Sequence, residues 1–181
     1  MRAFAPSISS RIAHDAAPEE AIPLKAKLIV LLLALLVAGL VQTPAAGAYS
    51  ATKWRATMLK QINHYRAGHG LRPLRINTRL SSAAAAHSKN MARYRMLSHT
   101  SSNGMSWSTR IRHFGFRGSW MGENLAVGWW SARVALAAWA HSSAHNANLL
   151  SGHFSAVGIG VRQGTYSGHR VLYMTTDFGG R

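Results

Sequence analysis

The sequence has no cysteine, only five acidic residues among 181, and no apolar run long enough to span a membrane. Without cysteine, the chain can form neither disulfides nor thiolate–metal sites, so it is not a small disulfide-stabilised scaffold and must fold by packing. Its most apolar stretch, Leu28–Val41, has 14 residues, whereas a membrane-spanning helix needs about 20.

This apolar stretch has the features of an export signal. Two lysines precede it and the small-residue pattern Ala46-x-Ala48 follows it, which is the order found in cleaved secretory signals. We therefore expect residues 1–48 to be a signal peptide, with a retained N-terminal anchor as the alternative. Residues 49–181 are then one domain, long enough for a real core, in an exported protein of the extracellular space or cell envelope.

Basic residues dominate the predicted domain. Four of the 21 basic residues and three of the five acids lie before residue 49, which leaves 17 basic residues and two carboxylates, Glu123 and Asp177. Such an excess of positive charge predicts attraction to polyanions, such as wall polymers or anionic lipid head groups. The basic residues are spread along the chain and no nucleic-acid-binding motif is present, so we expect no specific nucleic-acid recognition.

Hydrophobic periodicity predicts helices first and strands at the end of the domain. Helical patterns begin near residues 51, 78, 105 and 131. We expect the apolar stripe of the second helix to end at Tyr94. The last helix is expected to run through residues 131–150 and to bury Val134, Ala138 and Trp139. Residues 154–163 and 169–179 alternate as strands do, with a hairpin turn between them. This order indicates an α+β domain in which helices cover a small antiparallel sheet.

Glu123 is the most unusual residue, because it stands in an otherwise apolar segment. A buried carboxylate is costly unless a cation or a set of donors pairs with it. Most of the nine histidines after residue 48 are expected at the surface or in satisfied core positions, whereas His99 and His145 are candidates to meet Glu123. A His141–His145 pair can bind a metal, but the segment lacks the glutamate of a metalloprotease helix. Asp177 is expected to pair with an arginine.

Several fragments occur together in an order that is specific to one family. The ordered set is Asn63-x-x-Arg66, His99, Gly122-Glu123-Asn124, Trp139-x-x-Ser142-x-x-His145-x-x-Asn148 and Gly158-x-Gly160. Over about residues 54–181, the chain resembles the bacterial branch of the CAP superfamily. These are SCP-like extracellular domains related to cysteine-rich secretory proteins, antigen 5 and pathogenesis-related 1 proteins.

The resemblance implies a three-layer α–β–α sandwich with a central cleft. In that family two histidines and two glutamates gather in the cleft, and the histidines can hold a divalent cation, often zinc. At matching positions the cleft residues are His99, Glu123 and His145, while the second glutamate is replaced by Ser142. A mechanism that needs two carboxylates in the cleft therefore lacks one of them in this chain. The remaining motif residues are expected to have structural roles: Asn63, Arg66, Gly122, Asn124, Trp139, Asn148, Gly158 and Gly160.

Three interpretations of the histidine–glutamate group stay open: a structural network, a cation or ligand site, and a catalytic site. We expect a secreted or wall-associated monomeric binding module that requires no cofactor but can hold Zn²⁺ or another divalent cation. Its expected ligand is an anionic wall polymer, a lipid or a protein. The expected partners also include a membrane surface that the protein contacts peripherally. The alternative is a metal-dependent, peptidase-like hydrolase with Glu123 as general base. Against it, zinc hydrolases usually have three protein ligands, and two are proposed here.

Four tryptophans around the expected cleft either line a ligand groove or fill the core. Trp139 lies at helical spacing beside small residues, so we expect it in the core, and Trp120 is left open between the two roles. Trp129 and Trp130 are adjacent in a strand-like run, so one is expected to face inward and the other outward.

Overall fold

The predicted leader falls outside the part of the chain that is described here. The computed structural model describes residues 50–128 and 131–181. The expectations for residues 1–48, and for the orientations of Trp129 and Trp130, therefore stay predictions. The described residues belong to one compact unit. Among these residues, no helix combines the length and apolar character needed to cross a membrane.

Five helices and four strands make up the described residues. In chain order they are α2 (Ala51–Ala67), β1 (Arg75–Ile76), α3 (Thr78–Tyr94), α4 (Trp107–His113), β2 (Trp120–Gly128), α5 (Ala132–Ala140), α6 (Ser143–Leu149), β3 (Ala156–Tyr166) and β4 (His169–Gly180). Polar side chains accept hydrogen bonds from the first backbone N–H groups of four helices, which stabilises the helix starts. These capping residues are Ser50, Asn77, Ser106 and Ser131.

The sheet has the strand order β1-β3-β4-β2. β3 and β4 form the predicted hairpin, and β2 pairs antiparallel with β4. The sheet is mixed rather than wholly antiparallel, because the short β1 runs parallel to β3. Two backbone hydrogen bonds attach it: Arg75 N donates to Ser155 O (3.1 Å) and Asn77 N donates to Val157 O (2.9 Å).

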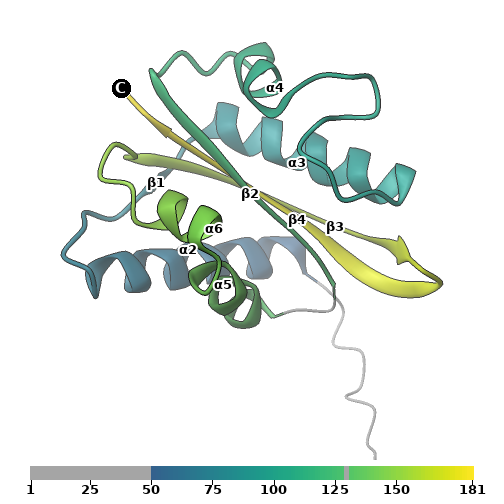
Figure 1. The fold of residues 1–181 in the computed structure, drawn as a ribbon, viewed down its shortest axis with the longest axis horizontal. Coiled ribbons are helices and arrows are strands. Elements are labelled where there is room, and N and C mark those ends of the chain that lie inside the picture. The colour runs from purple at the N-terminus through teal and green to yellow at the C-terminus, as the bar shows by residue number, and fades with distance from the viewer. Residues whose placement is uncertain (1–49, 129–130) are drawn as a thin grey trace, which may run out of the picture. The chain divides into compact units, whose positions relative to one another are not determined.

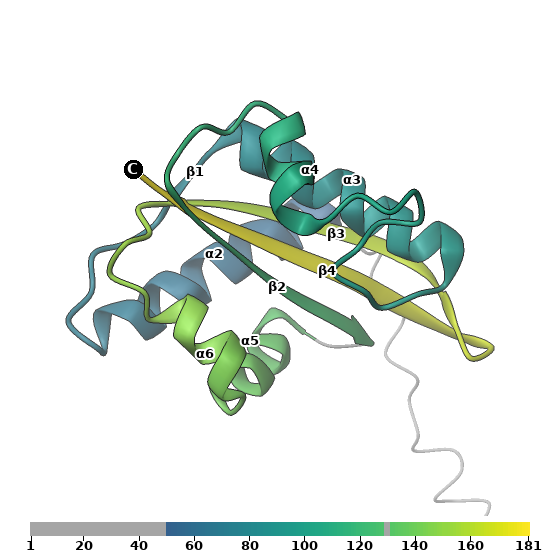
Figure 2. The ribbon, with the colours of Figure 1, turned by 45° about the horizontal axis from the view of Figure 1, so that its top comes forward.

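Helices cover both faces of this sheet, which confirms the predicted α–β–α sandwich. α3 and α4 lie on one face, and α2, α5 and α6 lie on the other (Figure 1), as the rotated view in Figure 2 also shows. Alternate residues of β4 enter the two layers, because successive strand side chains point to opposite faces. Leu172 and Met174 pack on the α2 side, whereas Val171 and Tyr173 pack on the α3 side.

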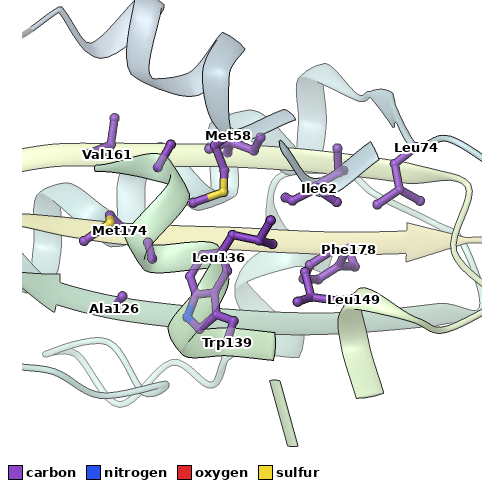
Figure 3. Packing of buried hydrophobic residues seen from close by; sticks show 14 of the residues in the cluster. Met58, Ile62, Leu74, Ala126, Leu136, Trp139, Leu149, Val161, Met174 and Phe178 are labelled. Carbon is purple, nitrogen blue, oxygen red and sulfur yellow. The ribbon is translucent and has the colours of Figure 1, made fainter. Parts of the chain in front are cut away.

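The larger core cluster lies between the sheet and the α2–α5–α6 layer (Figure 3). α2 contributes Met58 and Ile62 to it, and the predicted core residue Trp139 is 1% exposed. The indole N–H of Trp139 donates to Leu125 O over 2.9 Å. The polar end of this large side chain is therefore satisfied inside the core and ties α5 to β2.

The predicted helix over residues 131–150 is in fact two helices, since the chain turns at His141 and Ser142 between α5 and α6. His141 ends the first helix and His145 belongs to the second. The two histidines therefore do not share a face of one continuous helix, which removes the geometric basis for a His141–His145 metal pair.

The predicted inward orientation of Val134 and Ala138 is wrong, because both are exposed. The face of α5 that meets the core instead carries Leu136 and Trp139 together with two alanines. An alanine-rich helix offers two comparable apolar faces, and the packing partner selects the one with the larger side chains. Tyr94 was also expected in the apolar stripe of α3 but is 53% exposed, because the last buried turn of α3 ends at Met91.

Two glycines let α3 lie directly on β3. A Cβ atom on Gly158 would come within 2.0 Å of the carbonyl carbon of Leu80, and one on Gly160 within 2.2 Å of Ala84 O. Glycine in a strand often marks such a close approach of another backbone. This contact sets how closely the α3 layer, which carries part of the candidate site, approaches the sheet.

Candidate functional site

Glu123 is buried on the edge strand β2 and is paired with two side chains from the α3–α4 layer. Its side chain is 1% exposed, and Oε1 accepts a hydrogen bond from His99 Nδ1 over 2.7 Å. Oε2 accepts a short hydrogen bond from Nη2 of Arg110. Charge-assisted hydrogen bonds of this kind offset the desolvation of a buried carboxylate. The predicted contact between His99 and Glu123 is thus present in the structure.

Arg110, on α4, is the partner of Glu123 that sequence reasoning missed. Its side chain is 3% exposed, and Nη1 donates to Ser101 Oγ (2.9 Å) and to His99 O (3.3 Å). One guanidinium group therefore holds both the glutamate and the loop that carries His99. The apolar surroundings of Glu123 indicated that some cation was needed, but they did not identify which of the 17 basic residues supplies it.

His87, on α3, fixes the same loop from the other side. It is fully buried, its Nε2 lies 2.8 Å from Ser98 O, and its Nδ1 lies 3.3 Å from Ser101 Oγ. Burial lowers the pKa of His87. This neutral, hydrogen-bonded histidine matches the expectation of a satisfied core position, and it holds the segment that places His99 over Glu123.

Asp177 lies directly opposite Glu123, because these residues are register partners on β4 and β2. It is fully buried, and neither carboxyl oxygen has a hydrogen-bond partner among the described residues. Burial, and then the charge of Glu123, raise the pKa of Asp177 well above its ordinary value. The predicted pairing of Asp177 with an arginine is wrong: no ion pair joins them in the described chain, because the nearby guanidinium of Arg110 is directed at Glu123.

His145 enters the site from α6, on the opposite layer. Its Nδ1 lies 2.9 Å from Ser142 Oγ. Burial, and then the charge of His99, lower the pKa of His145. Both histidines lie beside β2: His99 contacts the side chain of Glu123, and the backbone carbonyl of His145 accepts a hydrogen bond from Asn124.

Two asparagines of the predicted motif hold α6 against β2. Asn124 Nδ2 donates to His145 O (3.0 Å), and Asn148 Nδ2 donates to Asn124 Oδ1 (2.8 Å) and to Glu123 O (3.2 Å). Gly122 leaves room for this network, because a Cβ there would lie 2.6 Å from Asn148 Oδ1.

The first motif, Asn63-x-x-Arg66, organises the chain between α2 and β1. The side-chain amide of Asn63 donates to Leu74 O (3.0 Å) and accepts from Leu74 N (2.8 Å). Arg66 is 1% exposed and donates to the carbonyl oxygens of four residues, which are Arg72, Leu149, Ser151 and Phe154. These bonds bring the α2–β1 loop and the α6–β3 loop together.

The chemistry available at this group is more suited to ligation than to proton abstraction. Each oxygen of Glu123 accepts a hydrogen bond and the side chain is 1% exposed, so little of the carboxylate is accessible to an external substrate. His99 is 53% exposed and its Nδ1 is held by Glu123, which leaves Nε2 as the ring nitrogen for a ligand. Within residues 50–128 and 131–181, no group of three or more histidine, aspartate or glutamate side chains is placed to hold a metal ion.

The fold and this site together define the class of protein. It is an α–β–α sandwich in which a buried glutamate on the edge strand β2 accepts hydrogen bonds from His99 and Arg110 of one covering layer. The chain belongs to the CAP family, the cysteine-rich secretory protein family, whose model matches residues 59–178.

Two relatives from Bacillus subtilis (strain 168) are similar in sequence. The uncharacterized protein YkwD is 29% identical over 118 residues, which is 65% of this chain and 46% of that protein. The uncharacterized membrane protein YlbC is 30% identical over 129 residues, or 66% of this chain and 37% of that protein. The chain thus spans less than half the length of either relative.

Solved structures confirm the fold. An extracellular protein containing a SCP domain from Bacillus anthracis has 26% identity and a TM-score of 0.56, over 75% of this chain and 45% of that one. An outer surface protein from Borrelia burgdorferi has 22% identity and a TM-score of 0.63, over 74% of this chain and 96% of that one. At this identity the second similarity shows the fold alone.

Proposed function

We propose that the protein is an exported binding module in which His99 and His145 together hold a divalent cation beside Glu123. The orientation of His99 carries this proposal. Its Nδ1 lies 2.7 Å from a carboxylate oxygen of Glu123, so the ring is fixed and Nε2 is left for a ligand. Histidines that bind metals commonly have their second ring nitrogen held by a carboxylate or another acceptor in this way.

The environment of His145 supports the same role. Its Nδ1 is held by Ser142 Oγ at 2.9 Å, and burial lowers the pKa of His145, which keeps the ring neutral at physiological pH. A neutral imidazole is the form that ligates a metal. With two protein ligands, a zinc ion retains further coordination positions for water or for an oxygen donor of the bound partner.

The proposed location and partners follow from the relatives and from charge. One structurally similar protein, at 26% identity, is an extracellular protein containing a SCP domain, which supports export to the extracellular space or cell envelope. Both carboxylates among the described residues, Glu123 and Asp177, are buried. Acidic side chains of the described chain therefore do not offset the positive surface, which favours an anionic wall polymer, lipid or protein as partner of a monomeric module.

The hydrolase alternative is disfavoured by the state of Glu123. A general base must reach the proton it abstracts, whereas both oxygens of Glu123 are hydrogen-bonded and its side chain is 1% exposed. Turnover of a peptide or glycan substrate that disappears in a folded Glu123→Ala variant would reverse this preference.

A zinc titration by calorimetry tests the cation site. We expect micromolar binding by the parent protein and its loss in a His99→Ala/His145→Ala variant. The matched control is His64→Ala/His169→Ala, since both of these histidines are exposed and lie elsewhere, and it should bind as the parent does. Equal binding by all three proteins, or none by the parent, would overturn the proposal and leave a structural network.

A further inference from the structure

Arg66 carries a buried positive charge that no carboxylate of the described chain compensates. Its side chain is fully enclosed, and the four residues that accept its hydrogen bonds do so through neutral backbone carbonyls. Burial lowers the pKa of Arg66, although a guanidinium group remains charged at physiological pH. A buried cation with neutral partners favours an anion nearby, because the low dielectric strengthens their attraction.

Two adjoining cavities lie where such an anion could approach. One has a volume of about 850 Å³ and Arg66 in its wall, and the other has about 550 Å³. They share Asn77, Ser155, Ala156 and Arg181, so they adjoin, and we call the two together the arginine groove. Its lining includes Gly180, at the C-terminal end of β4, and Arg117, Gly118 and Ser119 of the α4–β2 loop.

Arginine dominates the charge of this groove. Six arginines line it: Arg66, Arg72, Arg75, Arg79, Arg117 and Arg181. The last five are exposed, and no acidic side chain lines the groove. The groove also contains the N-terminus of α3, a helix of 17 residues that begins after Asn77, and this end of a helix carries partial positive charge.

We propose that the arginine groove binds a linear polyanion whose repeating units are small polyols joined by phosphodiester groups. Arginine suits this ligand because its planar fork donates two parallel hydrogen bonds to phosphate oxygens. The groove is far larger than one phosphate group, so it can accommodate several consecutive units. Asn77, Ser119 and Ser155 add neutral polar groups that can hydrogen-bond to polyol hydroxyls. This inference extends the proposed binding role and does not depend on the cation site.

The lining residues of the groove disfavour two other anionic partners, single-stranded nucleic acids and lipid bilayers. Its aromatic residues, Phe116 and Phe154, are 8% and 7% exposed, so the groove lacks the exposed stacking surfaces that single-stranded nucleic acids use. Its arginines line a concave surface, which fits an extended chain better than the flat face of a bilayer. These two partners are therefore outcomes that the experiment must distinguish.

Calorimetric titration with a glycerol-phosphate oligomer, without added metal, tests the proposal. The variant is Arg75→Gln/Arg79→Gln, since both side chains are exposed and form no ion pair among the described residues. We expect the parent to bind the oligomer and the variant to bind it at least about tenfold more weakly, because the variant loses charge-assisted hydrogen bonds to phosphate oxygens. Zinc binding should be the same in both proteins.

The matched control is Arg93→Gln/Arg133→Gln, which removes the same charge from exposed positions outside the groove. If both double variants lose affinity equally, attraction is a property of the net charge and the proposed site is wrong. No binding of the oligomer by the parent also overturns it. Binding to single-stranded DNA or to phosphatidylglycerol vesicles that equals or exceeds oligomer binding, at the same phosphate concentration, would assign the groove to those partners instead.

Discussion

At the scale of single residues, the centre of the site is a pair of carboxyl groups on neighbouring strands. Glu123 and Asp177 face each other across β2 and β4, and Arg110 supplies its short hydrogen bond to Glu123. Two carboxylates this close cannot both ionise readily in a buried setting. Burial raises the pKa of Asp177 well above its ordinary value, and its carboxyl oxygens have no hydrogen-bond partner among the described residues, so we expect Asp177 to be the carboxyl group that retains its proton.

Replacement of Asp177 by asparagine tests this assignment through pH. The folded-state pKa of Asp177 is raised above its unfolded value, mainly by burial and then by the charge of Glu123, so the parent loses stability as pH rises above that unfolded value. Asp177→Asn keeps the shape of the neutral form and has no proton to lose. We expect the unfolding free energy of Asp177→Asn to rise relative to that of the parent by up to about 1.4 kcal/mol per pH unit. This rise should continue until the pH reaches the folded-state pKa of Asp177 in the parent.

Urea denaturation of both proteins from about pH 2.5 upward measures the difference as the pH rises from below an ordinary aspartate pKa toward the raised value. Near the lower end of this pH range, the difference in unfolding free energy between the two proteins should no longer depend on pH. A difference that stays constant over the whole range would mean that Asp177 does not titrate as proposed.

At the scale of elements, the contact between α3 and β3 decides how the α3 layer sits on the sheet. Leu80 and Ala84 of α3 approach the strand backbone at Gly158 and Gly160 so closely that no side chain fits between them. The same helix carries His87, which holds the loop of His99. The position of α3 is thus transmitted to the candidate site through packing and hydrogen bonds.

Gly158→Ala should therefore destabilise the fold. The new methyl group would lie 2.0 Å from the carbonyl carbon of Leu80, and backbone cannot move aside as a flexible side chain can, so we expect a loss of at least about 1–3 kcal/mol. Thermal and urea unfolding measure it. Gly152→Ala is the matched control, because no atom lies within 4 Å of its Cβ position; a loss of equal size there would exclude steric overlap as the cause.

At the scale of the whole molecule, positive charge greatly exceeds negative charge. The full chain has a formal net charge of +16, and both acidic side chains of the described residues are buried. Like charges then face one another across the surface, which favours expanded states over the compact one. The same excess of positive charge favours the proposed binding of a polyanion. It therefore destabilises the compact folded state and strengthens binding.

Added salt should stabilise the protein for this reason. Raising NaCl from about 20 mM to about 300 mM shortens the screening length and weakens the repulsion between surface arginines and lysines. We expect the melting temperature to rise by a few degrees, as measured by calorimetry. Chloride is preferred to sulfate or phosphate, which are expected to bind the arginine groove. A melting temperature that falls with NaCl would mean that the described ion pairs contribute more than the surface repulsion.

Local sequence patterns were sufficient for several of the elements and for part of the site. Strand alternation in β3 and β4 and the stripe of α3 indicated an α+β domain, because burial of one face imposes a period on the chain, whereas the three-layer sandwich was implied by the family resemblance. The spaced motifs identified His99, Glu123 and His145 as residues to examine together. The predicted buried face of α5 was wrong, since an alanine-rich helix has two faces of similar polarity and the local pattern does not distinguish between them.

The tertiary structure alone decided which residues meet at the site. Asp177 opposes Glu123 because of the register between strands 54 positions apart in the chain, and Arg110 reaches the same carboxylate from a helix that looks amphipathic and ordinary in sequence. The arginine groove likewise combines residues from the α2–β1, α4–β2 and α6–β3 loops. Burial and charge compensation act through space, so they become visible only when the chain has brought distant residues together.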